Sequence, residues 1–246
     1  MSHGRGTGRL RIRARRPLRV LAAKSAIAGL LAVLAIFFFE GTASAAKSTN
    51  ASQLSKAKKS LLVLADLPKG WTSSKASNNN SPFPGAAQLA SCIGVPASLI
   101  TYNAPSVSSP DFTSKDQLLL VGDSVQVYRS AKAAQADFSS LANAKTPSCM
   151  TADLNGPGKA EFDAQIGGGV GNITVTRTPA SDFAPHSTNF TMFLPVMAEG
   201  VTVNVELILV DYVKGREEQT VVLSAFQSTF PTSLARHLTT VADGRI

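Results

Sequence analysis

The last third of the chain restricts the fold most, because its side chains alternate between apolar and polar over consecutive segments. Residues 189–196 and 201–213 place an apolar residue at every second position, and residues 217–226 continue as a third segment. A period of two is typical of a β-strand with one face in the core. The connections at 198–200 and 214–215 are short. We therefore predict an antiparallel meander of three strands.

Helices and further strands are predicted around this meander. The sequence predicts helices at 53–66, 86–93, 131–144 and 231–242, a strand or bent strand at 117–129, a shorter strand at 172–176 and a helical turn at 147–149. Segments 73–85 and 96–111 contain Pro, Asn and Ser at many positions and are predicted to be irregular. This layout favours an α+β fold, a twisted antiparallel sheet with helices packed on it.

The first 45 residues have the composition of an export signal. Eight basic residues precede an uncharged apolar run from Ser25 to Phe39, and the small residues Ala43-Ser44-Ala45 follow. This order is typical of a secretory signal peptide. The alternative is an uncleaved anchor, but spanning a bilayer needs about 20 apolar residues, which this run lacks. We predict a signal peptide at 1–45 cleaved near Ala45, a flexible lead-in at 46–52 and one domain at 53–246.

The export signal also accounts for the basic charge of the chain. The whole sequence carries +8, of which residues 1–45 supply 8 basic and 1 acidic residue, or +7. From Ala46 onward 16 basic residues face 15 acidic ones, which leaves +1. A nearly neutral domain lacks the basic surface that nucleic acid requires. We therefore predict no nucleic-acid partner, and contact with a membrane only through a retained leader.

Two cysteines, Cys92 and Cys149, lie beyond the leader. An even pair in an exported protein is most simply a disulfide. Closing a loop of roughly 60 residues would contribute about 4 kcal/mol in the chain-entropy model. Free or metal-bound thiols are the alternative, but no second Cys or His lies at ligand spacing from either cysteine. The sequence therefore predicts a disulfide and no metal site.

Three sequence segments occur in an order that is found in a known family. They are "LLVLADLPKGW" at 61–71, "SSPDF" at 108–112 and "VQVYRSAKAAQADFSSL" at 125–141, with Cys92 and Cys149 interspersed. Together they resemble the actinobacterial extracytoplasmic sensor-like domain of PknH-type receptor kinases and of its secreted and lipoprotein relatives. The resemblance implies a twisted antiparallel sheet with helices, a disulfide-stapled fold and a cleft for an unidentified ligand. The chain departs from that pattern with one cysteine pair instead of two and no kinase segment.

The segment Gly122-Asp123-Ser124 has the wording that introduces the nucleophile of GDSL-type esterases. Such an enzyme needs the serine at a strand-to-helix turn, and a base and its orienting acid spaced D-x-x-H. Neither His186 nor His237 follows an aspartate at that spacing, and residues 125–128 continue in strand alternation. We therefore predict that Gly122 and Asp123 bend or turn a strand pair, and that no residue is catalytic.

Two aromatic residues are the candidate ligand contacts. Trp71, the single tryptophan, and Tyr128 are most simply core residues, but pockets are commonly lined by aromatic side chains. The histidines are interpreted as surface residues, His237 half-buried on the last helix and His186 in a loop. The acids Glu161 and Asp163 lie in a loop-like segment without a second constellation for acid–base chemistry.

No cofactor is predicted. The glycine-rich segment 167–171 precedes a strand pattern, whereas a phosphate loop needs a helix start. The sequence therefore favours an exported cell-envelope domain that binds an unknown small molecule or envelope component without catalysis. One alternative is an envelope interaction protein that binds a protein or cell-wall polymer by its surface. Another is an unrecognised secreted hydrolase that uses Ser124.

Overall fold

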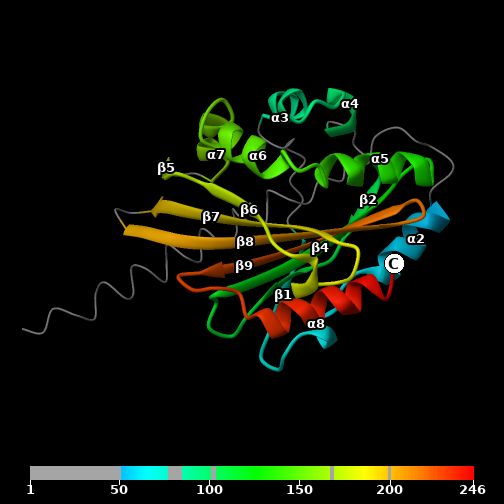
Figure 1. The fold of residues 1–246 in the computed structure, drawn as a ribbon. Helices are drawn as coiled ribbons and strands as arrows, with labels where there is room; N and C mark the ends of the chain where they lie inside the picture. Colours follow the sequence, from blue (N-terminus) through cyan, green and yellow to red (C-terminus); the bar gives the residue numbers. More distant parts are fainter. Residues whose placement is uncertain (1–50, 77–84, 101–103, 167–168, 199–200) are drawn as a thin grey trace, which may run out of the picture.

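The computed structural model describes residues 51–76, 85–100, 104–166, 169–198 and 201–246 (Figure 1). The predicted signal peptide, most of the lead-in and part of the glycine-rich segment lie outside these residues. Among the described residues, no helix is both long and apolar enough to cross a bilayer.

The centre of the molecule is one open antiparallel sheet, and the predicted fold class is confirmed. Its strands are β1 (Thr72–Ser74), β2 (Ser106–Ser108), β3 (Asp111–Thr113), β4 (Leu119–Val127), β5 (Gly169–Val170), β6 (Thr174–Arg177), β7 (Thr188–Ala198), β8 (Val201–Lys214) and β9 (Glu217–Phe226). They follow the order β1-β3-β4-β9-β8-β7-β5, with β2 beside β4 and β6 beside β7. The predicted meander is the run β7-β8-β9.

Helices lie on both faces of this sheet (Figure 1). They are α2 (Ala51–Ser60), α3 (Ala86–Ile93), α4 (Ala97–Ile100), α5 (Ala131–Leu141), α6 (Thr146–Leu154), α7 (Lys159–Ile166) and α8 (Thr232–Asp243), with short 3₁₀ turns η1 (Leu64–Asp66) and η2 (Ala180–Asp182). Helices α3 to α7 lie over one face, which we call the α5 face. Helices α2 and α8 lie over the other, which we call the α8 face.

Coverage on both faces explains the long apolar run of β8. Leu207 and Leu209 point to the α5 face and join a cluster with helices α3, α6 and α7. Ile208 and Val210 point the other way and pack with α8. Alternate side chains of a strand enter opposite layers, so a central strand with helices on both sides has to be apolar at nearly every position.

The prediction of one helix over 53–66 was wrong at its second half. Helix α2 ends at Ser60 and the chain turns again only in η1. The backbone N–H of Leu62 points to the buried carboxylate of Asp123, at 3.2 and 3.3 Å from its two oxygens. In a continued helix this N–H would donate to the carbonyl four residues earlier. The hydrogen bond to Asp123 replaces that helical hydrogen bond, and the helix ends.

The segments predicted to be irregular contain short regular elements. Strand β2 and helix α4 lie in segment 96–111, β1 and β3 overlap the ends of the two segments, and α7 contains Glu161 and Asp163. Each of these three strands has only three residues. Such strands have little hydrophobic period of their own and depend on hydrogen bonds from a partner strand, so sequence periodicity does not detect them.

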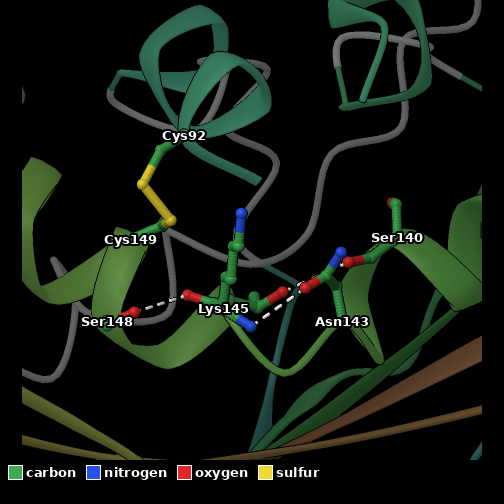
Figure 2. Close-up of a disulfide and its surroundings, with 7 residues drawn as sticks. Cys92, Ser140, Asn143, Lys145, Ser148 and Cys149 are labelled. Carbon is green, nitrogen blue, oxygen red and sulfur yellow. Dashed lines mark hydrogen bonds between the residues drawn. A yellow bond between two sulfur atoms is a disulfide. The ribbon is translucent and has the colours of Figure 1, made fainter. Parts of the chain in front are cut away.

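The predicted disulfide is confirmed. Cys92 of α3 is bonded to Cys149 of α6 (Figure 2). The Cys149 side chain is buried in the cluster of the α5 face, whereas Cys92 is exposed. The bond therefore holds the outer helix α3 to a helix that packs directly on the sheet.

Candidate functional site

Strand β4 separates the two residues that suggested an esterase. It pairs with β9 without interruption from Leu119 opposite Ala225 to Val127 opposite Glu217. Asp123 therefore points to the α8 face and Ser124 to the α5 face. Both side chains are buried, at 0% and 4% exposure. The side chains of these two adjacent residues thus lie on opposite faces of the sheet.

The irregularity predicted at Gly122–Asp123 lies in the neighbouring strand instead. Ser108 of β2 is opposite Ser124, whereas Phe112 of β3 is opposite Val121. From Ser108 to Phe112 the chain advances four residues, whereas β4 advances only three between their partners Ser124 and Val121. One extra residue on one side of a strand pair is a β-bulge. Ser109 occupies this bulge, and its hydroxyl accepts a hydrogen bond from the Asp123 backbone N–H at 3.0 Å.

The Asp123 carboxylate joins helix α2 to the sheet. It accepts hydrogen bonds from the Leu62 backbone and, at 2.7 Å, from Nε2 of Gln219. Complete burial raises the pKa of Asp123 to about 6, even though hydrogen bonds involving Ser109 and Gln219 favour the charged form. These hydrogen bonds give Asp123 a structural role at the junction of the sheet and the segment that follows α2.

On the α5 face, five polar residues form a continuous row across the sheet, and Ser124 is one of them. The cross-strand partners, from β7 to β2, are Thr188, Asp211, Thr220, Ser124 and Ser108. The Thr220 hydroxyl donates to the Asp211 carboxyl at 2.5 Å. This polar row marks the boundary of the large apolar cluster on the same face. Beyond it the sheet is covered by α5.

A cluster of acids lies beside the row, under α5. Asp137 of α5, Glu218 of β9 and Asp211 of β8 are close enough for their charges to repel. Burial raises the pKa of Asp211 to about 7 and that of Asp137 to about 6, and it raises the pKa of Glu218 well above its ordinary range. These groups therefore hold protons at a pH where exposed acids are charged.

Tyr128, one of the two predicted ligand contacts, lies within this acid cluster. Its side chain is 1% exposed. The hydroxyl donates to Oε1 of Gln126 at 2.9 Å and is also hydrogen-bonded to Asp137. Burial, followed by the charges of Glu218 and Asp137, raises the pKa of Tyr128. The residue contacts the acids under α5 in this structure and lines neither of the two cavities described below.

Trp71, the other predicted contact, lines an open groove of about 590 Å³ on the α8 face. The lining residues are Pro68, Lys69, Trp71, Ser114, Lys115, Asp116, Leu119 and Leu234. They come from the loop before β1, the turn between β3 and β4, the first residue of β4 and the first turn of α8. Trp71, Leu119 and Leu234 are partly buried against the core of this face, so they form an apolar floor.

Two lysines flank this Trp71 groove. The β1–β3 register, extended by two residues, places Gly70 opposite Lys115, and a Cβ at Gly70 would lie 3.6 Å from Lys115 Cδ. Among the described residues, neither Lys69 nor Lys115 forms an ion pair. The Asp116 carboxylate, in contrast, has partners, because it accepts hydrogen bonds from the Ser114 hydroxyl and the Leu118 N–H. The hydrogen bond from Ser114 lowers the pKa of Asp116.

A second cavity, of about 300 Å³, lies where β6 ends and β7 begins, and its lining includes Arg177. Its guanidinium already donates to the carbonyls of Leu141 and Asn143 and to the Thr188 hydroxyl. It also lies over the Phe190 ring, 5.1 Å from the centroid. Arg177 therefore serves to hold the end of α5 to the sheet.

The structure does not bring Ser124 together with a described histidine. His237 is exposed on α8, on the other face of the sheet, with Nε2 3.3 Å from the carbonyl oxygen of Asp66. His186 is exposed two residues before Thr188, and Thr188 lies three strands from Ser124, roughly 14 Å at the usual strand spacing. Among the described residues, no group of three His, Cys, Asp or Glu side chains is placed to hold a metal ion.

Other sequence candidates lie apart from these features. Glu161 is exposed on α7, and Asp163 pairs with Lys159 one turn away. Three apolar side chains of the β7–β8 hairpin, Phe193, Met197 and Val201, are 46%, 58% and 41% exposed. This is the surface on which the interaction-protein alternative would rest.

Sequence reasoning missed most residues of the groove and of the acid cluster. Lys69, Lys115 and Leu234 carry no pattern that links them, because they come from separate elements. Asp211 did carry a signal, since it interrupts the apolar run of β8. An acid at that point of a strand buried on both faces had to be paired or protonated.

Comparison with known proteins finds little. No protein-family model matches the chain, and no curated protein matches it. Among solved structures, the extracellular domain of PknH from Mycobacterium tuberculosis is a weak structural neighbour, with a TM-score of 0.32 and 10% sequence identity. The match covers 58% of this chain and 78% of that one. The family resemblance therefore receives no support from sequence comparison, and the function has to be argued from the site.

Proposed function

We propose that this chain is an exported binding domain of the cell envelope, without catalytic activity, and that the Trp71 groove is its ligand site. The observation that carries the proposal is the combination of an indole, two leucines and two lysines around one open cavity. The leader-like sequence and the disulfide support an oxidising compartment.

The lining favours a ligand with an apolar body and an anionic group. Trp71, Leu119 and Leu234 offer an apolar floor, on which each buried CH₂ of a ligand would contribute about 0.8 kcal/mol. Lys69 and Lys115 supply two cationic groups at the rim, while the Asp116 charge is satisfied by its own turn. Exposed ion pairs contribute up to about 1 kcal/mol each, so the apolar contact supplies affinity and the lysines supply selectivity.

The single tryptophan makes the proposal directly measurable. Laurate, used below its micelle concentration, should change Trp71 fluorescence in a saturable manner, because no other indole contributes. Leu234→Asp should weaken laurate binding at least tenfold by placing a charge on the apolar floor. The double variant Lys69→Gln, Lys115→Gln should weaken laurate binding by about three- to tenfold, with little effect on neutral dodecanol.

Lys145→Gln is the matched control, because this exposed lysine lies on the α5 face at the start of α6. It should bind laurate as the parent does. Binding of laurate and dodecanol that is unchanged in Leu234→Asp would remove the groove as the ligand site. Equal losses for laurate and dodecanol in the double lysine variant would leave the groove in place and reject the anionic class.

The hydrolase alternative has less support. Ser124 is buried within β4, Asp123 points to the opposite face, and His237 lies across the sheet. A nucleophile needs a base within hydrogen-bond reach, and the described histidines are distant from Ser124. Hydrolysis of a short-chain ester that disappears in Ser124→Ala, with unchanged stability, would contradict a non-catalytic role.

A further inference from the structure

Helix α5 is held to the sheet by few apolar contacts. Of its residues, only Ala134 and Ser140 are buried. Ala134 joins a small cluster with Ala104 and Tyr128, against which Ala133 and Val213 pack. Elements with small apolar anchors open locally at low free-energy cost. Polar contacts must therefore contribute much of what keeps the first half of α5 in place.

The main polar contact of that half is the hydroxyl of Tyr128. It is hydrogen-bonded to Gln126, to Asp137 and to Glu218. A phenol has one proton to donate. Even if the Gln126 amide is turned to donate its own N–H, the hydroxyl can satisfy only one of two ionised carboxylates. The arrangement therefore requires a proton on Asp137 or on Glu218.

In the part of the chain that the structure describes, no cation replaces this proton. Asp137 faces the cluster from α5, Asp211 from β8 and Glu218 from β9, while β4 contributes Gln126 and helix α4 contributes no titratable side chain. Among the described residues, none of these three carboxyls forms an ion pair. Arg216, at the β8–β9 turn, uses its Nε to donate to the Tyr128 carbonyl at 2.7 Å. Oε2 of Glu218 is buried and accepts no hydrogen bond from a described residue.

The other end of α5 is fixed independently of these acids. Arg177 of β6 donates to the carbonyls of Leu141 and Asn143 at 3.3 and 2.8 Å. The chain then enters α6, which the disulfide joins to α3 (Figure 2). Loss of the acid contacts would therefore free the first half of α5 and leave its last turn attached.

We propose that α5 is a pH-sensitive cover of the sheet. It lies closed while Asp137 and Glu218 share a proton with Tyr128, and its first half lifts when this cluster is deprotonated, which uncovers Asp211 and Glu218 on the two strands beneath it. The direction of the pH dependence follows from the raised pKa of Asp137 and of Glu218. The folded, closed state binds more protons than the open one, so closure is favoured at low pH and weakens as the pH rises through about 6 and above.

Hydrogen exchange of the whole chain tests this cover. After correction for the intrinsic exchange rate, protection of the amides of residues 131–137 should fall at least tenfold between pH 5.5 and pH 8. The amides of β8 and β9 should keep their protection. In Glu218→Gln, or in Asp137→Asn if the first variant does not fold, the helix should keep equal protection at both pH values.

Glu161→Gln removes an exposed acid on the same layer and should behave as the parent. Three outcomes would overturn the proposal. One is less than a twofold change of protection in α5 of the parent. Another is the parent's pH dependence persisting in Glu218→Gln and Asp137→Asn. The third is an equal loss of protection in α8, because that would report global unfolding.

Discussion

Replacing Asp211 with asparagine should stabilise the protein at pH 8 by about 2–4 kcal/mol and should change little at pH 4. Asp211 is buried, forms no ion pair with any residue that the structure describes, and burial raises its pKa to about 7 from an ordinary value of 3.8. The folded state therefore binds more protons than the unfolded state between these values. Its contribution to stability is lost as the pH rises from 4 to 7.

Asparagine removes the charge and keeps an acceptor for the Thr220 hydroxyl, which donates to Asp211 at 2.5 Å. Urea unfolding at pH 4, 6 and 8 measures the effect. The parent should lose stability with rising pH, and Asp211→Asn should lose much less. Glu161→Gln, an exposed acid on the same face, is the control. A parent protein that becomes more stable from pH 4 to pH 8 would contradict the prediction.

Removing the disulfide should destabilise the protein by about 4 kcal/mol. Cys92 and Cys149 are separated by 57 positions, and opening a loop of that length restores chain entropy to the unfolded state. The loss should appear first in α3 and α4, because α3 is joined to the sheet through α6 and α4 packs on α3 and α5. The result applies equally to reduction and to the double variant Cys92→Ala, Cys149→Ala.

Urea unfolding of the double variant gives the size of this effect, and hydrogen exchange shows where protection is lost first. Ser91→Ala changes an exposed neighbour of Cys92 and serves as the control. A change below about 1 kcal/mol in the double variant would show that α3 is held by its apolar contacts alone.

Much of the fold could be predicted from local patterns. The alternation in residues 189–226 predicted β7, β8 and β9, because a strand buried on a face has to repeat every second residue. Segment 86–93 became α3 with the same bounds. One prediction failed because a distant side chain accepts a backbone hydrogen bond: the Leu62 N–H donates to the Asp123 carboxylate instead of continuing the helix. Others failed because the short strands β2 and β3 are stabilised by pairing with β4 and not by a pattern of their own.

Only part of the candidate site could be predicted from the sequence. Trp71 could be named as a ligand contact because of its residue type, but the two lysines and Leu234 around it come together only through the β1–β3 pairing and the start of α8. Tyr128 was chosen for the same reason as Trp71, yet the fold encloses it among acids. Residue type does not reveal which layer a side chain enters.

By itself, the sequence determined the α+β class, the meander and, since there are two cysteines, which pair could form a disulfide. Only the tertiary structure decided that Ser124 belongs to a row with Thr220, Asp211 and Thr188, and that Asp123 faces away from it. The physical reason is register. A period of two tells which residues of one strand share a face, whereas the alignment of strands far apart in the chain depends on packing across the whole sheet.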